Sequence, residues 1–386
     1  MLKTLGAQIK EFKKDSFLTP VFMILEVLME TIIPLMMASI IDNGVEAGDI
    51  HHIYVMGGCM VIVACISLFA GTMGGKYGAR ASAGFARNLR KAMYENIQTF
   101  SFSNIDKFST AGLVTRLTTD VTNLQNAYQM LLRMCVRAPI SLICAMIMAF
   151  FINARLASFY LIAVIVLGMI LAIITVRAHH YFMEVFPKYD DLNASVQENV
   201  SAIRVVKAYV REDYEKKKFT QASKNIYNMF VKAEGVLAFN SPVMQIAVYS
   251  CIIALSWLGA KMIVAGSLTT GELMSLLTYC MNIMMSLMML SMVFVMLAMS
   301  IASAERICEV LNEKSDITNP ENPVYEVADG SVTFDHVTFR YNKTSDKPIL
   351  DDVNLSIRSG ETIGVIGGTG SSKSSLVNLI SRLYDV

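Results

Sequence analysis

The run LASFYLIAVIVLGMILAIITVR, residues 156–177, decides the fold of this chain. It is long enough to cross a bilayer, because a spanning helix needs about 20 predominantly apolar residues. Five further segments meet the same requirement: 17–41, 53–75, 134–152, 236–262 and 273–300. Composition agrees, since only 17% of the 386 residues are charged, against about 25% in soluble proteins. The sequence therefore predicts an all-α membrane domain with six spans.

The distribution of lysine and arginine predicts the orientation of the spans. Four basic residues lie in 1–16, seven in 76–127 and ten in 177–235, whereas the short turns carry only Arg155 and Lys261. Basic residues accumulate in cytoplasmic segments. The N-terminus, both long connecting segments and everything after the sixth span are therefore predicted to be cytoplasmic. The polar N-terminus shows no cleavable signal peptide, and the net charge of +1 argues against a nucleic-acid partner.

The two long connecting segments, 76–133 and 178–235, have the period of amphipathic helices, with apolar residues at every third or fourth position. A helix from about 53 to 100 would be ~70 Å long, so ~40 Å would project beyond the hydrocarbon. Short crossing segments are predicted near 101–109 (SFSNIDKFS) and 208–216 (AYVREDYEK). Such stalks suggest mechanical contact with a cytoplasmic domain.

A soluble domain is predicted to start near residue 331. The membrane domain is assigned to 1–311 and a linker with two prolines to 312–330. Alternating apolar and polar residues then predict strands at 331–341 and 348–357, and the short apolar run ETIGVI, 361–366, predicts a buried strand. Residues 331–386 thus form the start of an α/β domain.

The segment GGTGSSKSS, residues 367–375, differs from the phosphate-binding pattern G-x-x-x-x-G-K-[ST] at one position, where Ser372 replaces glycine. It lies between the predicted strand and a predicted helix, SSLVNLISRLY, which is the context that the motif requires. The alternative is a chance glycine-serine turn. A side chain at 372 would cost about 1–3 kcal/mol if the backbone is strained, so phosphate binding is predicted to be weakened but not abolished.

In such a loop, backbone N–H groups and the helix N-terminus surround the phosphates. Lys373 would reach the β- and γ-phosphates, and the hydroxyl of Ser374 would enter the Mg²⁺ shell. The candidate nucleotide-contacting residues of the loop are Gly367, Gly368, Thr369, Gly370, Ser371, Ser372, Lys373, Ser374 and Ser375.

Two features of the predicted spans could contact cargo. Glu26 and Glu30 lie on one face of the first span, and acidic residues inside a membrane usually face a cavity or a partner. They either recognise cationic substrates, or form a structural hydrogen bond or face water without specificity. Met288, Met292 and Met296 belong to a methionine stripe along the sixth span, which suits either promiscuous binding or plain packing. The seven cysteines are interpreted as buried small hydrophobes, with no metal or disulfide chemistry.

A six-span domain with stalks, followed by Phe339-Arg340-Tyr341, a strand pair and GGTGSSKSS, resembles an ATP-binding-cassette (ABC) exporter half-transporter. Residues 100–139 are similar to the first intracellular loop of heterodimeric bacterial multidrug exporters, 198–215 to the second, and 269–279 to the entry of the sixth helix. The resemblance implies ATP and Mg²⁺ as cofactors and Tyr341 as the aromatic that stacks on adenine; ordinary packing of Tyr341 is the alternative. It also implies two coupling segments, which contain Ser103, Asn104, Ile105 and Asp106, and Tyr209, Arg211 and Glu212.

The resemblance implies ATP-driven export of small amphipathic or hydrophobic molecules across the cytoplasmic membrane. The chain would be a multi-pass subunit embedded in the lipid bilayer and would pair with a second half-transporter, a heterodimer being favoured over a homodimer. Alternatives are lipid or peptide translocation, or a nucleotide-binding partner subunit that does not hydrolyse ATP. The family's signature, acidic strand and switch histidine have no counterpart in 331–386. We therefore expect an incomplete nucleotide-binding domain, truncated early, with no catalytic residues and no ATP hydrolysis by this chain alone.

Overall fold

The computed structural model describes residues 1–386 except 320, 328 and 342–346, and it leaves out the side chains of 179, 182, 183, 186, 187, 190, 295, 298 and 299. The helices of the described residues are α1 (Leu2–Gly6), η1 (Ala7–Phe12), α2 (Lys13–Ser39), η2 (Ile40–Glu46), α3 (Ile50–Ile97), α4 (Phe102–Phe108), α5 (Thr110–Thr115), η3 (Arg116–Asp120), α6 (Val121–Ile152), α7 (Ala154–Ser201), α8 (Ile203–Ala208), α9 (Glu212–Ala238), α10 (Asn240–Val264), α11 (Thr270–Asn312) and α12 (Lys373–Ile380). The strands are β1 (Val332–Phe339) and β2 (Leu350–Ile357).

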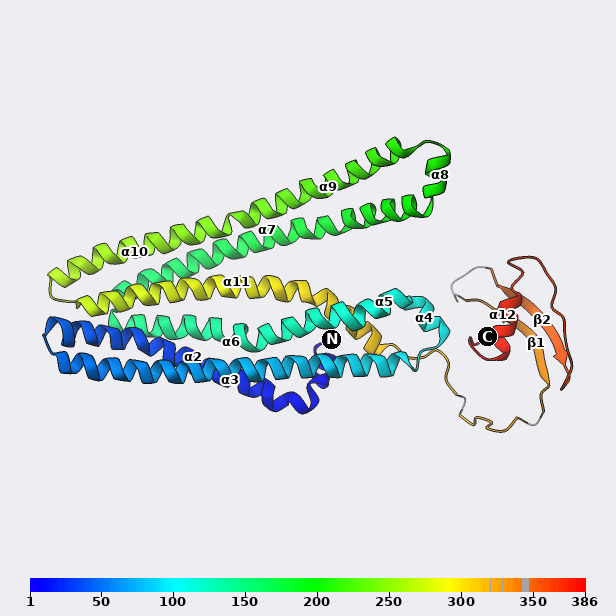
Figure 1. Ribbon diagram of the computed structural model, residues 1–386, viewed down its shortest axis with the longest axis horizontal. Helices are drawn as coiled ribbons and strands as arrows, with labels where there is room; N and C mark the ends of the chain where they lie inside the picture. The colour runs from blue at the N-terminus through cyan, green and yellow to red at the C-terminus, as the bar shows by residue number, and fades with distance from the viewer. Residues whose placement is uncertain (320, 328, 342–346) are drawn as a thin grey trace. The chain divides into compact units, whose positions relative to one another are not determined.

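The prediction of six spans is confirmed. Six helical stretches are long and apolar enough to cross a membrane: Leu2–Glu46, Ile50–Ile97, Thr110–Ile152, Ala154–Ala178, Glu212–Val264 and Thr270–Phe294. Several continue far beyond the apolar part; α3 and α7 each have 48 residues, or about 70 Å of helix. The predicted stalks are therefore continuous with the spans (Figure 1).

The chain forms two compact units. The smaller unit comprises 1–12, 82–126 and 300–386, and the larger unit comprises 13–81 and 127–299. This division differs from the predicted boundaries at 311 and 330. Polar contacts join Asn96 on α3, Asn104 on α4 and Arg116 on η3 to the end of α11 within the smaller unit, so the boundary between the compact units falls inside the long helices. The domain limits at 311 and 330 stay predictions.

The core of the larger unit contains two fully buried tyrosines. The Tyr160 hydroxyl donates to the carbonyl of Leu276 at 2.8 Å, and the Tyr279 hydroxyl donates to the carbonyl of Thr31 at 2.6 Å. Buried hydroxyl groups need such partners. Each bond joins two helices, so the tyrosines fix α7 to α11 and α11 to α2.

The start of α11 is tied to η2, which follows α2. The carboxylate of Asp42 accepts hydrogen bonds from the Thr269 hydroxyl at 2.7 Å and from the Gly271 N–H at 2.8 Å. A Cβ at position 271 would lie 2.5 Å from the carbonyl oxygen of Ala38. Glycine is therefore required for this close approach of α11 to α2.

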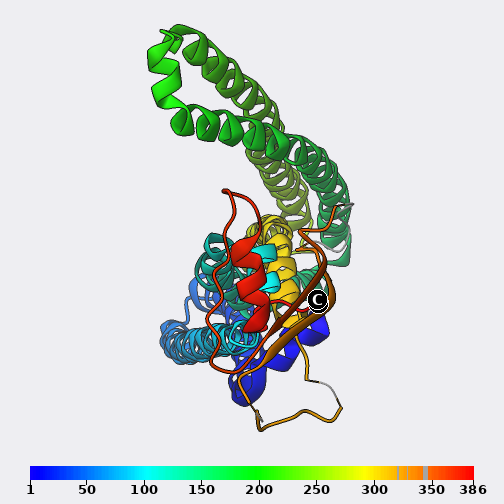
Figure 2. The same cartoon turned by 90° about the vertical axis from the view of Figure 1, so that its right-hand side faces the viewer.

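The helices α7 and α9 lie side by side, and α8 crosses between their ends (Figures 1 and 2). The predicted crossing at 208–216 is wrong in position, because α8 covers 203–208 and α9 begins at Glu212. Val210 has a φ of 50° and turns the chain. Glu212 and Asp213 occupy the first turn of α9, where acidic side chains favour helix formation.

The last part of the smaller unit contains the predicted strand pair. β1 and β2 are antiparallel, with Val332 opposite Ile357 and Phe339 opposite Leu350. The prediction of a strand at 361–366 is wrong, because these residues are irregular and exposed. A strand buried in a parallel sheet needs neighbours on both sides, and the described residues pair only β1 with β2.

Candidate coupling and nucleotide sites

The first crossing helix, α4, begins with a capping box. The Ser101 hydroxyl accepts the N–H of Asn104, and the Asn104 side-chain oxygen accepts the N–H of Ser101 at 3.1 Å. This reciprocal pair satisfies two donors that a helix start leaves open. The signal is local, since SFSN supplies both side chains within four positions, and it explains why the crossing at 101–109 is predicted correctly.

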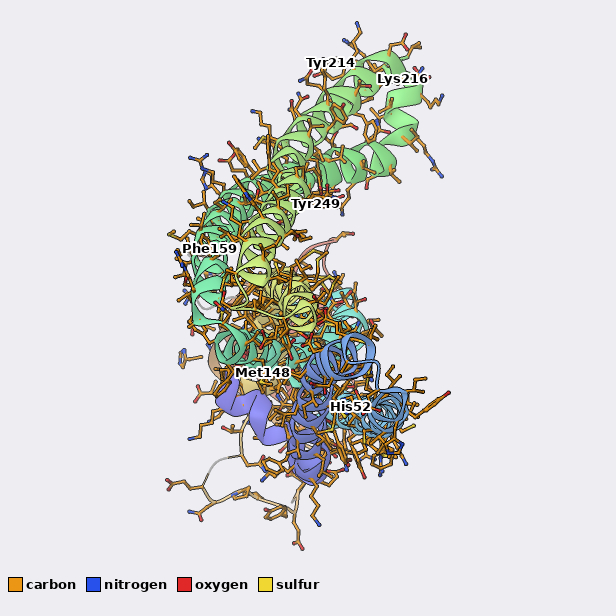
Figure 3. All side chains as sticks on the ribbon, turned by 90° about the vertical axis from the view of Figure 1, so that its left-hand side faces the viewer. His52, Met148, Phe159, Tyr214, Lys216 and Tyr249 are labelled. Atoms are coloured by element: carbon orange, nitrogen blue, oxygen red, sulfur yellow. The ribbon has the colours of Figure 1, made fainter. Side chains whose placement is uncertain are left out.

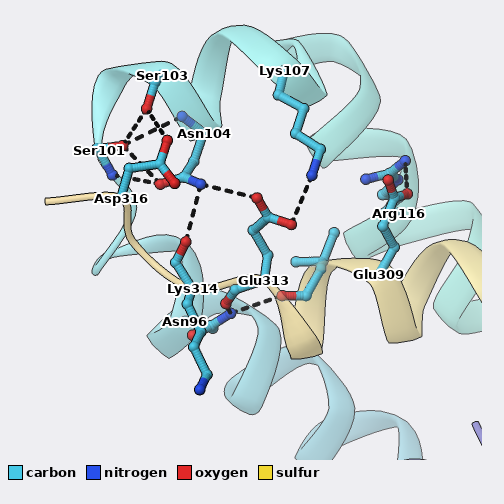
Figure 4. A network of polar contacts seen from close by, with 11 residues as sticks. Asn96, Ser101, Ser103, Asn104, Lys107, Arg116, Glu309, Glu313, Lys314 and Asp316 are labelled. Atoms are coloured by element: carbon cyan, nitrogen blue, oxygen red, sulfur yellow. Dashed lines mark hydrogen bonds and ion pairs between the residues drawn. The ribbon is translucent and has the colours of Figure 1, made fainter. Parts of the chain in front are cut away.

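The buried amide of Asn104 also binds the end of α11 (Figure 4). It is 1% exposed, and its Nδ2 donates to Oε1 of Glu313 at 3.0 Å and to the carbonyl of Lys314 at 3.1 Å. One side chain therefore caps α4 and holds the residues that follow α11.

The contacts of four more side chains complete what we call the coupling network. Lys107 pairs with Glu313 at 2.8 Å, Ser103 donates to Asp316 at 2.7 Å, Arg116 pairs with Glu309 at 2.8 Å, and Asn96 donates to the carbonyls of Val310 and Glu313 at 2.7 and 2.9 Å. The hydrogen bond to Glu313 raises the pKa of Lys107 above its ordinary value. Figure 4 shows how these side chains converge from α3, α4 and η3 on the end of α11.

The coupling residues predicted in the first segment lie in or beside this network. Ser103 and Asn104 are members, Ile105 is half-buried, and Asp106 accepts a hydrogen bond from the Tyr384 hydroxyl at 2.9 Å. Burial, and secondarily this hydrogen bond, raise the pKa of Tyr384 to about 12. The partner Glu313 was not predicted; it lies more than two hundred positions away, and no local pattern marks it.

A second polar contact fixes α11 beside the start of α6 in the smaller unit. The carboxylate of Asp120, 1% exposed, accepts from Nε of Arg306 at 2.8 Å and from the Ser303 hydroxyl at 2.9 Å. Removing one partner of a buried ion pair leaves an uncompensated charge. The contact therefore fixes which faces of the two helices meet.

The second predicted coupling segment is more exposed. Tyr209 is 74% exposed and lies with Arg211 in the turn after α8, whereas Glu212 is the first residue of α9 and accepts from Lys207 at 3.1 Å. Figure 3 places Tyr214 and Lys216 at this end of the hairpin. Beside the turn is a cavity of about 370 Å³, lined by apolar residues such as Val196, Val200 and Phe219 and by polar ones such as Asn199 and Glu212.

The backbone of the phosphate loop at Ser372 has a conformation that is unusual for a residue other than glycine. Ser372 has φ 60° and ψ 23°, in the left-handed region, directly before α12. A residue other than glycine pays about 1–2 kcal/mol there. Nζ of Lys373 donates to the carbonyls of Gly367 and Gly368, both at 2.7 Å, and to the hydroxyl of Ser371 at 3.1 Å. The lysine thus lies over its own loop, at the start of a helix.

Tyr341 lies beside this loop. Its hydroxyl is 2.9 Å from the Ser375 hydroxyl, and its ring meets those of Phe339 and Tyr384 edge to face, with centroids 4.9 Å apart in both cases. Tyr341 as a whole is 45% exposed. The structure therefore brings the predicted adenine-stacking residue and the predicted loop together. The lysine amine, the exposed Ser374 hydroxyl and the helix start are donors and ligands that fit ATP with Mg²⁺.

The two carboxylates of the first span share one arginine that the sequence did not single out. Nη1 of Arg137, on α6, pairs with Oε1 of Glu26 at 2.8 Å. Its Nη2 donates to both oxygens of Glu30 at 2.9 Å. The helical spacing places the two glutamates on one face, but nothing in the sequence identifies Arg137 as their partner.

The methionine stripe of α11 is accessible in the larger unit. Met288, Met292 and Met296 are 51%, 60% and 38% exposed, and Met281 and Met285 are exposed with them. Met299 lies among the residues whose side chains are not described. Cargo contact and plain packing both stay predictions for this stripe.

The cysteine interpretation is correct only in part. Cys280 and Cys308 are buried, but Cys59 and Cys65 are exposed on α3. On a spanning helix such exposure places a small apolar side chain against lipid. Among the described residues no disulfide forms, and no group of three metal-ligating side chains gathers.

Comparison with known proteins identifies the class. Residues 16–288 match the ABC transporter transmembrane region. The chain therefore belongs to the ABC transporter transmembrane family and is a multi-pass membrane protein.

Individual relatives are similar over most of this chain. YfiB of Bacillus subtilis strain 168, an uncharacterised ABC transporter ATP-binding protein, is 33% identical over 94% of this chain and 63% of its own length. Rv1273c of Mycobacterium tuberculosis H37Rv, described in the same words, is 33% identical over all of this chain and 66% of its own length. An ATP-dependent lipid A-core flippase of Syntrophus aciditrophicus is 27% identical over 86% of this chain and 53% of its own length. The chain thus spans about two thirds of the length of the first two relatives.

Proposed function

We propose that this chain is one half of a dimeric ABC exporter that uses ATP and Mg²⁺ to move small amphipathic or hydrophobic molecules across the cytoplasmic membrane. The observation that carries the proposal is the coupling network. It ties the first crossing helix to the end of α11, and the same compact unit contains the phosphate loop. A protein that only bound nucleotide would have no need to anchor a crossing helix to the end of a spanning helix.

Exposed apolar side chains on the α7–α9 hairpin support pairing with a second half-transporter. Val200, Tyr209 and Tyr227 are 66%, 74% and 66% exposed, and all lie outside the predicted spans. Apolar surface of this kind usually marks an interaction site. A heterodimer is favoured by the resemblance of both coupling segments to heterodimeric exporters.

The methionine stripe is proposed to contact cargo. Methionine is flexible and polarizable, which suits surfaces that accept several ligands. Replacing Met288, Met292 and Met296 together by leucine should narrow the range of molecules transported while preserving apolar volume. An unchanged range would remove the stripe from the cargo path.

The test is transport and ATP turnover by the intact transporter in proteoliposomes, alone and with a candidate partner half-transporter. We expect cargo-stimulated ATP hydrolysis and accumulation of an amphipathic dye, both lost in Lys373→Ala if this loop serves turnover. Nucleotide binding without turnover, even with the partner, would instead identify a regulatory subunit.

Lipid translocation is a second candidate, favoured by the similarity to the lipid A-core flippase. In the same proteoliposomes, ATP-dependent flipping of a fluorescent lipid without dye accumulation would favour lipid as the cargo. Dye accumulation without flipping would favour small molecules.

A further inference from the structure

The cluster formed by Glu26, Glu30 and Arg137 is unbalanced in charge. Two carboxylates share one guanidinium, with N–O distances of 2.8 to 2.9 Å. Arg133, one turn earlier on α6 and about 6 Å away along the helix, forms no ion pair in the described part of the chain, and its Nε has no hydrogen-bond partner there. At contact distance the cluster therefore has one carboxylate more than it has cations.

The cluster lies at membrane depth. Glu26 is thirteen residues before the end of α2 at Ser39, which is about 20 Å of helix. Arg137 is fifteen residues before the end of α6 at Ile152, which is about 23 Å. Since the hydrocarbon core is about 30 Å thick, the cluster falls in the half of the membrane away from these helix ends. An excess charge there is costly unless it is compensated.

The two carboxylates differ in what can reach them. Glu26 is 9% exposed, and its Oε2 is buried with no hydrogen-bond donor among the described residues. It is pressed against α3 at Gly71, where a Cβ would lie 3.0 to 3.3 Å from the carboxylate atoms. The Glu30 side chain is 42% exposed. A ligand can therefore reach Glu30, whereas Arg137 can reach the open oxygen of Glu26.

We propose that Glu30 binds a single cationic group of the cargo, a primary or secondary amine, and that Arg137 then shifts fully onto Glu26. The guanidinium now divides its donors between two carboxylates, but its planar fork can hold one carboxylate through two parallel hydrogen bonds. Once an amine takes Glu30, the guanidinium can supply the donor that Oε2 of Glu26 lacks. Two carboxylates then face two cations, and the charge is balanced. This inference rests on the proposed export function and specifies the charge of the cargo.

The experiment measures ligand binding by the intact transporter in nanodiscs without nucleotide. The probes are a dansyl-labelled long-chain primary amine and its N-acetylated, uncharged counterpart. In Glu30→Gln, we expect the amine to bind about tenfold more weakly, the scale of one charge-assisted hydrogen bond, while the acetylated probe binds as before. Glu46→Gln, which removes an exposed carboxylate beyond the end of α2, is the matched control and should leave both probes unaffected.

A second variant guards against misfolding of the first. Glu26→Gln also leaves one carboxylate for one arginine, so Arg137 should be retained by Glu30 and amine binding should again weaken. The inference would be overturned if Glu30→Gln or Glu26→Gln bound the amine as tightly as the parent does, or if a variant lost affinity equally for the amine and the acetylated probe. Binding in nanodiscs is measured without ATP and therefore does not depend on the export function. A preference for the amine in this binding assay, together with no ATP-driven transport in proteoliposomes, would refute only the proposed function. Export of both probes without preference would refute only the inference.

Discussion

The role of Asn104 can be tested by replacing it with alanine. The change removes the hydrogen bonds to Ser101, to Glu313 and to the carbonyl of Lys314, in a position that is 1% exposed. At about 1 kcal/mol for each hydrogen bond, the loss is about 3 kcal/mol. The residues of α4 that depend on this side chain should then open locally about 100-fold more often.

Hydrogen exchange of the intact transporter measures this opening. Amides of 102–108 and 313–316 should exchange about 100-fold faster in Asn104→Ala, under conditions where reclosing is faster than chemical exchange. Asn225→Ala, which removes an exposed asparagine on α9, should leave both segments unchanged. If the amides of α4 kept their parental rates in Asn104→Ala, the network would not be what holds the crossing helix, and the reasoning would be refuted.

Three further predictions concern the loop, the helix entry and the hairpin. Ser372→Gly relieves a left-handed backbone and should tighten nucleotide binding about fivefold; fluorescent-nucleotide titration that finds equal affinities would contradict this. Gly271→Ala should destabilise the protein by about 1–3 kcal/mol through overpacking and lower the melting temperature, whereas Gly57→Ala, which meets open space, should not. The hydrogen bond and charge of Lys218 lower the pKa of Glu198 below its usual 4.5, so their pairing stabilises at neutral pH and is lost as the pH falls through the lowered pKa. The melting temperature of Lys218→Met should accordingly lie below that of the parent at pH 7 and converge with it in acid; a constant difference would argue against the pairing.

Features set by local sequence were predictable. The length of an apolar run is enough to identify a span, and the serine and asparagine of SFSN are enough to start α4, because both effects act within a few positions. The alternation in 331–341 and 348–357 likewise predicted β1 and β2. The left-handed backbone at Ser372 was anticipated as a strain that a glycine would avoid.

Features set by distant partners were not predictable in the same way. Arg137 pairs with Glu26 and Glu30 across more than a hundred positions, and Glu313 meets Asn104 across 209. The segment 361–366 has the composition of a strand, but a strand forms only against neighbours. The predicted crossing at 208–216 lies too late in the chain, because Glu212, Asp213 and Glu215 already belong to the first turn of α9.

The exposed methionines make the apolar helix α11 sensitive to oxidation. Met281, Met285, Met288, Met292 and Met296 are all more than a third exposed. Peroxide converts a thioether to a sulfoxide, which is polar, and methionine sulfoxide reductases reverse the change. A cell under oxidative stress would therefore alter the polarity of one face of α11 without altering the gene, and a leucine stripe of equal volume would be inert to the same stress.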